Sequence, residues 1–385
     1  MGDIGVRNNL FNLPDNWQWV KSESVIDVRD GTHDTPEYHS DGVPFITSKN
    51  LVNGSVDFNG AAFISLKDHN KFSQRSKVDN GDILLAMIGT IGNPVLVETD
   101  REFSIKNVAL FKFTGSDVNN RYFRHLLDSK IIKRQMALAS RGGTQKFVSL
   151  KVLRNLNIPL PPLAEQKRIA AILDKADMLR TKRRAALAKL DSLVQSVFLE
   201  MFGDPVTNPM GWEERKLDET VNFTTGKLDS NAGVPGAQYP FFTCAREVYQ
   251  IDKYAFDCEA LLLAGNNASA DYWVKHYSGR FNAYQRTYVI TLKHEQDSFR
   301  YNYMKYALES KLLLMKRLSK GSNTRYLTLS ILKPIKIQVP DVETMTKFGL
   351  ITNEIGNHFA SNQTALTQLD NLFQALQQRA FRGEL

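Results

Sequence analysis

The sequence predicts a mixed α/β (α+β) protein in which two domains are separated by two long antiparallel helices that form a coiled coil, with pseudo-twofold symmetry. Three observations support this prediction. A stretch of about forty residues after Pro162 contains no Pro or Gly before Gly203. The chain repeats itself, with Phe202 falling on Phe381. Strand and helix signals alternate in the regions before and between the two long helices.

The first long helix is predicted within residues 159–203. Pro159, Pro161 and Pro162 end any preceding strand. At a rise of about 1.5 Å per residue, the helix would be about 60 Å long, which is more than a domain of this size needs. Its apolar residues recur at steps of three and four and predict a narrow seam that requires a partner helix; the seam comprises Ile169, Ile172, Ala176, Leu179, Ala186, Leu190, Leu193 and Val197.

An internal repeat supplies that partner. Residues 190–193 (LDSL) fall on residues 369–372 (LDNL), a shift of 179 residues, and residues 127–130 match 308–311 at a shift of 181. The order is therefore variable region, helix, variable region, helix. The predicted boundaries are 1–158 for the first domain, 159–203 for the first helix, 204–338 for the second domain and 339–385 for the second helix.

The second helix carries a similar seam, but His358 and Asn362 interrupt it where the first helix has Leu179 and Arg183. Polar seam residues fix register at a cost in stability; alternatively, the seam opens there toward another protein. Antiparallel pairing places one domain at each end of the helices and both termini near the first domain. The seam comprises Phe348, Ile351, Ile355, Leu366, Leu369, Leu372 and Leu376.

Each variable region is predicted to contain strands followed by a helix, with loops rich in Gly, Asn, Ser and Thr between them. Each region is long enough to bury its own core. The predicted strands are 81–89 and 107–113 in the first region and 260–264 and 287–292 in the second, and the predicted helices are 120–138 and 301–318.

Composition narrows the class of protein. Hydrophobic content is 42% and there is no apolar run long enough to cross a membrane, nor a secretory signal. Two cysteines, Cys244 and Cys258, are too few for a disulfide framework or a zinc site. We therefore expect a cytoplasmic protein without a cofactor or metal. The net charge of +8 favours a polyanionic partner over the alternative of a merely basic soluble protein.

No catalytic motif is present. Phosphate-binding loops, HExxH, GxSxG, CxxC and GxGxxG are all absent. Glu309-Ser310-Lys311 has the E-x-K spacing of a nuclease, but a solvated helix face explains it better. His33, His39 and His69 share no metal-ligand spacing. We expect a protein that is not an enzyme in its own right.

A basic, glycine-containing loop occurs twice, at residues 140–147 and 319–326. Glycine allows close backbone approach, hydroxyl and amide groups offer neutral hydrogen bonds, and Arg or Lys supplies charge, as contact with a phosphate backbone requires. The alternative is a β-turn held by its own Ser and Thr. The candidate DNA-binding residues here are Arg141, Gly142, Thr144, Lys146, Lys320, Gly321, Asn323 and Arg325.

Other loops carry side chains whose donors and acceptors match base edges. Each is also explained as an ordinary polar loop. The candidates for DNA binding are Thr32, His33, Ser48, Lys49 and Asn50 in the first region and Lys227, Arg246, Asn266, Asn267, Gln285 and Arg286 in the second.

Residues 159–169 (PLPPLAEQKRI), with 142–146, 30–33 and 42–46, give the chain a family resemblance. It resembles the specificity (S) subunit of type I restriction-modification systems over its whole length. The second copy of the Pro-rich motif departs from the pattern, reading VPDVETM at 339–345, which puts close packing or docking at the start of the second helix in doubt.

The resemblance implies two target recognition domains, each reading one half of a bipartite double-stranded DNA target. It implies that the helices act as a spacer and dock two methyltransferase (M) subunits, which carry the S-adenosylmethionine chemistry, and that motor-nuclease (R) subunits can add to the complex. The chain itself would be a non-catalytic subunit. The alternatives are a scaffold that binds protein ligands and, more remotely, a fused endonuclease. The target bases are not readable from the sequence.

Overall fold

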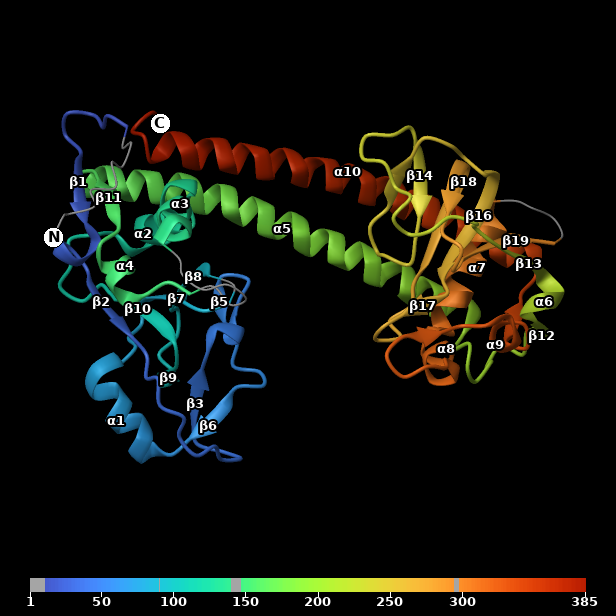
Figure 1. The fold of residues 1–385 in the computed structure, drawn as a ribbon, viewed down its shortest axis with the longest axis horizontal. Helices are drawn as coiled ribbons and strands as arrows, with labels where there is room; N and C mark the ends of the chain where they lie inside the picture. The colour runs from blue at the N-terminus through green and yellow to red at the C-terminus, as the bar shows by residue number, and fades with distance from the viewer. Residues whose placement is uncertain (1–10, 90, 140–146, 294–297) are drawn as a thin grey trace. The chain divides into compact units, whose positions relative to one another are not determined.

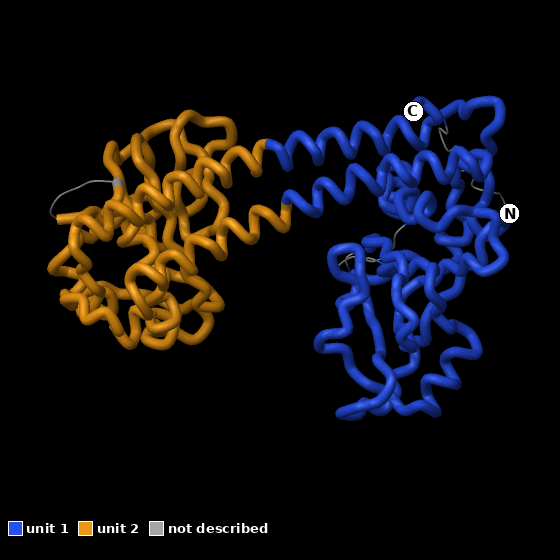
Figure 2. The backbone as a smooth tube through the Cα atoms, turned by 180° about the vertical axis from the view of Figure 1, so that it is seen from behind, with its two compact units in different colours: residues 1–183, 365–385 blue, residues 184–364 orange. Residues whose placement is uncertain are grey.

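The computed structural model describes residues 11–89, 91–139, 147–293 and 298–385. The chain divides into two compact units (Figure 2): unit 1 is Met1–Arg183 with Ala365–Leu385, and unit 2 is Arg184–Thr364. Each unit therefore contains part of both long helices. Among the described residues, no helix is long and apolar enough to cross a membrane.

The two predicted long helices are confirmed as α5 (Leu163–Phe202) and α10 (Val342–Ala380), drawn in green and red in Figure 1. Helix α5 begins at the Pro-rich motif, where the backbone N–H groups of Glu165 and Gln166 donate to the carbonyl of Pro162. It ends at Gly203, whose φ of +75° is the left-handed conformation common after a helix.

In unit 1 the two helices run antiparallel. Near the start of α5, Arg168 donates to the backbone oxygen of Leu385 at 2.9 Å, and twelve residues later Arg180 donates to Asp370 at 2.6 Å. The guanidinium of Arg180 also lies 4.2 Å from the ring centroid of Phe373. Arg180 therefore packs between the two helices, and its side chain is mostly buried.

In unit 2 an aromatic cluster joins the helices to the domain. Phe202 lies 5.2 Å from Phe348 and 4.7 Å from Tyr303, measured between ring centroids. Phe198 packs on the same three rings. Aromatic pairs in these stacked, tilted and edge-to-face arrangements contribute beyond the area they bury.

The predicted seams are partly wrong. Leu179, Leu193, Ile351 and Leu372 are exposed. The side chains buried instead include Leu173, Leu187, Val194, Phe198 and Phe373. The physical reason is that the part of each helix within a unit packs against that unit's domain as well as against the other helix, so the buried stripe is wider than a coiled-coil seam and displaced from it. His358 is exposed, and the amide of Asn362 donates to the His358 carbonyl at 2.7 Å.

Unit 1 contains a four-stranded sheet in the order β2-β10-β7-β8 and a three-stranded sheet in the order β6-β3-β9, with the pairs β1-β11 and β4-β5. The predicted strands 81–89 and 107–113 correspond to β7 and β10. The strands are β1 (Gln18–Lys21), β2 (Asp27–Asp30), β3 (Val43–Ile46), β4 (Leu51–Val52), β5 (Ser55–Val56), β6 (Ala62–Ile64), β7 (Ile83–Ala86), β8 (Gly92–Leu96), β9 (Ser104–Ile105), β10 (Val108–Lys112) and β11 (Asn157–Leu160), and the helices are α1 (Leu66–Ser76), α2 (Asn120–Leu127), α3 (Lys130–Ala139) and α4 (Leu150–Arg154).

Unit 2 contains a six-stranded sheet in the order β13-β19-β16-β18-β14-β15, with the pairs β12-β21 and β17-β20. The predicted strands 260–264 and 287–292 lie in β16 and β19. The strands are β12 (Glu213–Lys216), β13 (Val221–Thr225), β14 (Tyr239–Phe242), β15 (Tyr249–Ile251), β16 (Phe256–Ala264), β17 (Asn266–Asn267), β18 (Val274–Ala283), β19 (Thr287–Leu292), β20 (Arg325–Tyr326) and β21 (Lys336–Val339), and the helices are α6 (Leu217–Thr220), α7 (Ser298–Ser310), α8 (Leu312–Leu318) and α9 (Leu329–Leu332).

Each predicted helix of the variable regions is in fact two helices. In unit 1 the break between α2 and α3 contains the buried Ser129, whose hydroxyl accepts from the N–H of Ile132. In unit 2 the break falls at Lys311, whose ammonium group is buried against the carbonyl of Pro205 at 2.8 Å. The Glu309-Ser310-Lys311 triplet is therefore structural, and its lysine is enclosed where we expected it to be solvated.

The two units repeat one framework. In each, a tyrosine of the first helix after the sheet donates to a carbonyl of the strand that leads into a long helix: Tyr122 to Pro159 at 2.7 Å and Tyr303 to Gln338 at 2.9 Å. Phe381 in unit 1 and Phe202 in unit 2 pack on these tyrosine rings. The sequence repeat therefore corresponds to a repeated set of contacts between the tyrosine, the strand and a long-helix phenylalanine.

Candidate nucleic-acid interface

In unit 1, three loops meet beside Gly31. A Cβ atom on Gly31 would lie 2.3 Å from the carbonyl oxygen of Ile105, so only glycine fits this approach. The next residue, Thr32, donates its N–H to the same oxygen at 3.1 Å, and Lys106 donates its N–H to Ile46 at 2.9 Å. These bonds hold loops 31–35, 47–50 and 106–107 against one another.

The side chains of loop 31–35 are held by a buried carboxylate. His33, which is 64% exposed, contacts Asp30 through Nε2 at 3.2 Å and the side-chain oxygen of Asn107 through Nδ1 at 2.6 Å. Arg75 donates to the other oxygen of Asp30. Both ring nitrogens of His33 are therefore engaged within the cluster, although the ring remains exposed.

In loop 47–50 the candidates have different roles. The side-chain oxygen of Asn50 accepts from the N–H and the hydroxyl of Thr47, both at 3.0 Å, and its amide donates to the Asp57 carbonyl at 3.1 Å. Asn50 is buried, at 9% exposure, so it shapes the loop. Lys49 is exposed and Ser48 half-buried.

Unit 2 builds the same framework around Gly226. A Cβ atom there would lie 1.6 Å from the Ala283 carbonyl oxygen. Tyr284 donates its N–H to Phe242, and Gln285 donates its N–H to Leu228, both at 2.9 Å. Loops 226–229, 243–247 and 284–286 therefore meet as their counterparts do in unit 1. The sequence comparison missed the match of Gly31 with Gly226, although both follow the first strand of a sheet.

Two further loops join this site in unit 2. Gly265 donates its N–H to the Arg286 carbonyl and accepts from the N–H of Leu327, so β17 and β20 pair beside loop 284–286. The guanidinium of Arg286 lies 5.2 Å from the ring centroid of Tyr326. The structure thereby brings the loop beginning at Lys320 next to the other candidates.

Within that loop, Arg325 is used internally. It donates to the Ser319 hydroxyl at 3.1 Å and to the Gly321 carbonyl at 3.2 Å, and Gly321 has a φ of +112°. Lys320 and Asn323 are exposed. The turn is therefore held by its own side chains and still presents charge and amide groups to solvent.

Some polar side chains of loop 266–271, and that of Gln285, also make hydrogen bonds within the cluster. The side-chain oxygen of Asn267 accepts from the N–H groups of Ser269 at 2.9 Å and Asp271 at 3.3 Å. Gln285 donates to Asp229 at 2.7 Å. Asn266 is half-buried in β17, and Lys227 is exposed.

The structure thus gathers the described candidates into one loop cluster in each unit. Arg141, Gly142, Thr144 and Lys146 lie outside the described residues. Sequence reasoning missed several residues that shape these clusters, because their contacts depend on the fold and carry no local signal: Arg75, Lys106, Asn107, Asp271, Trp273 and Lys275.

Lys275 holds loop 243–247 of unit 2 in place. Its ammonium group donates to the carbonyls of Ala245 at 2.8 Å and Glu247 at 3.2 Å. Burial lowers its pKa. In the part of the chain that the structure describes, no group of three His, Cys, Asp or Glu side chains is arranged to bind a metal ion. The exposed side chains of these clusters, such as Lys49, Lys227 and Lys320, offer positive charge and hydrogen-bond donors.

Comparison with known proteins identifies the family. The model of the family described as "Type I restriction modification DNA specificity domain" matches residues 14–189 and 209–371. One match falls on each copy of the repeat, and together they cover most of the chain.

Individual relatives agree with this match. The chain is 34% identical over 181 residues to the type I restriction enzyme EcoDI specificity subunit of Escherichia coli, covering 46% of this chain but only 39% of that protein. It is 21% identical over 433 residues to the StySPI specificity subunit of Salmonella potsdam, covering 98% of this chain and 91% of that one.

A solved structure shares the fold. The type I restriction-modification S subunit from M. genitalium superposes with a TM-score of 0.61 at 15% identity, covering 96% of this chain and 98% of that one. The matched fold, the two matched segments and the repeated loop framework lead to one conclusion: the chain belongs to the family of type I restriction-modification DNA specificity proteins.

Proposed function

We propose that this chain is the DNA-specificity subunit of a type I restriction-modification complex and that each unit reads one half of a bipartite double-stranded DNA target. The observation that carries the proposal is the repeated three-loop framework around Gly31 and Gly226. Because the two copies share a framework but differ in their side chains, each copy would recognise a different base sequence.

The side chains at each cluster suit DNA. Lys49, Lys227 and Lys320 are exposed and supply charge for phosphates, while His33 and Arg246 are oriented by neighbouring carboxylates. Asn50, Asn267 and Arg325 act within the proposal as supports of the loops, because internal hydrogen bonds occupy their side chains.

The long helices provide the surface for partner subunits in this proposal. Side chains that are apolar and yet exposed recur along them, as expected of a surface that a partner covers. Two methyltransferase subunits would dock there and supply the S-adenosylmethionine chemistry, to which restriction subunits are added in a complete system. The chain itself would be non-catalytic and would work in the cytoplasm with the DNA. The exposed apolar residues are Met178, Leu179, Leu193, Leu199, Leu350, Ile351, Phe359 and Leu372.

The test is an exchange of residues 204–338 for the corresponding region of another specificity subunit. Methylation mapping of cells that carry the exchanged chain and its methyltransferase partner should show one new half-site, one unchanged half-site and an unchanged spacer. Exchange of residues 1–158 is the matched control and should change the other half-site. A change in both half-sites, or in neither, would contradict the two-reader proposal.

A further inference from the structure

We propose that Arg246 reads a guanine in the major groove of the half-site bound by unit 2, with Asp271 and Trp273 holding its guanidinium in place. This inference rests on the proposed function and deepens it, because it assigns one type of base to one side chain.

Arg246 lies in the loop that follows β14, and two side chains from outside that loop orient it. Its Nη2 donates to Oδ2 of Asp271 at 2.7 Å, and its guanidinium carbon lies 4.9 Å from the ring centroid of Trp273. The side chain is nevertheless 66% exposed. The guanidinium is thus restrained on two sides and open on the others.

The loops that carry Arg246 and Asp271 are themselves held in place. Lys275, two residues after Trp273 on β18, donates to the carbonyls on both sides of Arg246, at Ala245 and Glu247. The side-chain oxygen of Asn267 accepts from the N–H of Asp271 at 3.3 Å. Binding therefore requires little ordering of these loops, which favours affinity and specificity.

The hydrogen-bonding capacity of Arg246 matches guanine. An arginine side chain has five N–H donors, and Asp271 occupies one of them. Guanine presents two adjacent acceptors, N7 and O6, in the major groove, whereas adenine presents an acceptor beside a donor. The free edge of a restrained guanidinium therefore discriminates between the two purines.

The carboxylate of Asp271 argues for a base and against a phosphate. A phosphate bound to Arg246 would lie close to the negative charge of Asp271, and like charges repel. A guanine edge is neutral and suffers no such repulsion. Arg286, in the neighbouring loop, lies over Tyr326. Among the described residues it makes no ion pair with a carboxylate. Arg286 therefore serves as the control, an arginine expected to contact a phosphate.

The experiment measures binding of the chain, assembled with its methyltransferase partner, to duplexes of the target found by methylation mapping. Each guanine of the unit 2 half-site is replaced in turn by 7-deazaguanine, which lacks N7. For the wild-type chain, one replacement should weaken binding by roughly tenfold or more. For Arg246→Ala, the unmodified duplex should bind more weakly and that one replacement should have no further effect, while replacements at other guanines keep theirs.

Three further variants sharpen the test. Arg246→Lys keeps the charge but loses the paired donors, so it should also lose the sensitivity to that guanine. Asp271→Asn should reduce the sensitivity, because it removes the charged partner. Arg286→Ala should weaken all duplexes about equally and lower the salt dependence by about one unit of slope. A melting temperature equal to that of the wild-type chain shows that each variant is folded.

The inference and the proposed function fail in different ways. Specific binding that Arg246→Ala weakens by the same factor on every duplex overturns the assignment of Arg246 and leaves the specificity role intact. A unit 2 half-site without guanine overturns the assignment as well. A wild-type complex that shows no sequence preference overturns the proposed function itself.

Discussion

The two units share a backbone framework but fill their cores differently. In unit 1 the ring of Phe123 lies 5.3 Å from that of Phe111 and 5.8 Å from that of Phe113, measured between centroids. Phe111 pairs with Ile83 as Ile290 pairs with Leu261 in unit 2, and Phe123 follows Tyr122 as Met304 follows Tyr303. An aromatic trio in unit 1 is thus replaced by Ile290, Leu292 and Met304.

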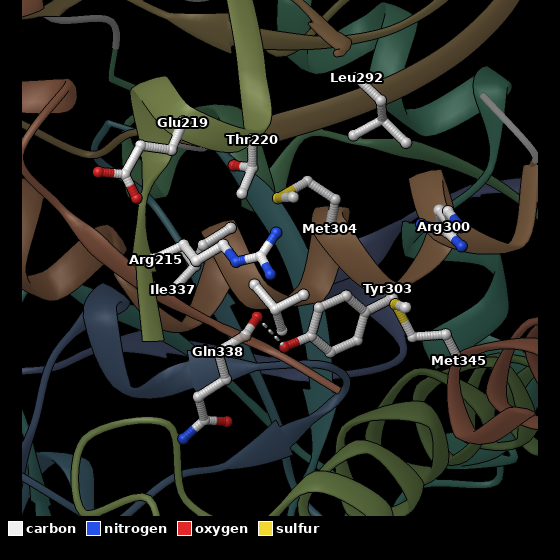
Figure 3. Close-up of a pocket in the computed structure, with 11 residues that line it drawn as sticks. Arg215, Glu219, Thr220, Leu292, Arg300, Tyr303, Met304, Ile337, Gln338 and Met345 are labelled. Atoms are coloured by element: carbon white, nitrogen blue, oxygen red, sulfur yellow. Dashed lines mark hydrogen bonds between the residues drawn. The ribbon is translucent and has the colours of Figure 1, made fainter. Parts of the chain in front are cut away.

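A pocket of about 90 Å³ lies at this place in unit 2, as Figure 3 shows. Tyr303 bonds to the backbone oxygen of Gln338 there, while the side-chain amide of Gln338 points away from the other labelled residues. Aliphatic and thioether side chains fill less space than the three phenyl rings of unit 1, and two of these smaller side chains, Leu292 and Met304, line the pocket together with polar residues such as Arg215 and Glu219. The residues that line it include Leu292, Met304, Ile337 and Met345.

The two long helices also begin differently. In unit 1 the buried Gln166 accepts from the N–H of Asn119 at 2.8 Å and donates to the Pro161 carbonyl at 2.9 Å. In unit 2 the corresponding residue is Met345, and the helix start is capped by Asp341, which accepts from the N–H of Thr344 at 2.8 Å and from its hydroxyl at 2.9 Å. These hydrogen bonds lower the pKa of Asp341.

Two sets of contacts are common to both units. Backbone bonds around Gly31 and Gly226 and the tyrosine-to-carbonyl bonds recur in both units. The core side chains and the contacts at the start of the long helices do not recur. The departure at residues 339–345 therefore replaces the hydrogen bonds of Gln166 at the first helix start with the Asp341 cap at the second.

The largest expected effect comes from breaking the shared loop framework. Gly226→Ala places a Cβ atom 1.6 Å from the Ala283 carbonyl oxygen, so the two backbone segments must separate. We expect unit 2 to lose more than about 3 kcal/mol of stability, with faster amide hydrogen exchange in β13 and β18.

Gly356→Ala is the matched control for this change. Gly356 lies exposed in α10, and a Cβ atom added there would meet nothing within 4 Å, so alanine should stabilise the helix by about 0.5–1 kcal/mol. Equal tolerance of both substitutions in denaturant titrations would show that the close approach at Gly226 is not required.

An intermediate effect is expected from exchanging the core residues between units. Met304→Phe should fill part of the pocket in unit 2 and raise its stability by about 1 kcal/mol. The reciprocal Phe123→Met should lower the stability of unit 1 by about 1–2 kcal/mol, because it removes two aromatic contacts. Thermal unfolding of each variant measures both changes. Destabilisation by Met304→Phe would mean that the pocket cannot accommodate a phenyl ring as the core of unit 1 does.

The smallest expected effect is a difference in pH dependence. Burial raises the pKa of Glu309 in unit 2, with Asp191 adding to the rise and Lys305 opposing it. The folded state then binds the proton more tightly than the unfolded chain, so stability falls as the pH rises through the interval between the unfolded and folded pKa values. Glu309→Gln should therefore raise the melting temperature slightly at neutral pH and leave it unchanged in acid.

Asp174 in unit 1 provides the contrast of opposite sign. Burial acts to raise its pKa, but hydrogen bonds from His125 and Arg121 outweigh burial and lower it. Its contribution to stability is therefore present above its unfolded pKa and is lost as the pH falls through the folded pKa. Asp174→Asn should lower the melting temperature at neutral pH, and melting curves in which both variants shift in the same direction would contradict this comparison.

Features set by local sequence were predictable. The long helices follow from spacing and from the Pro and Gly residues that bound them, and the repeat from direct comparison of Phe202 with Phe381. The side on which each helix is buried was less predictable. Leu193 was predicted to be buried, but it is exposed and Val194 is buried instead. Val194 packs against the domain of unit 2, and helical periodicity does not show on which side of α5 that domain lies.

The loop clusters show the same limit. Glycine, arginine, lysine and asparagine in loops marked the candidate residues, but not which of them are free to bind. Asn50 and Arg325 make hydrogen bonds within their own loops, and Arg246 depends on Asp271 and Trp273, which lie in the segment before β18. The partners of Asn50 and Arg325 lie within seven residues but depend on the turn that the loop adopts, whereas the partners of Arg246 depend on the packing of segments far apart in the chain.

The sequence by itself therefore determined that the chain contains two copies of one mixed α/β design, each followed by a long helix. Periodicity and repetition are properties of neighbouring residues, so they survive without coordinates. Only the tertiary structure decided that Gly31 and Gly226 occupy equivalent positions and that Arg246 is a restrained donor. Those facts depend on close approaches between segments, and a close approach is a property of packing.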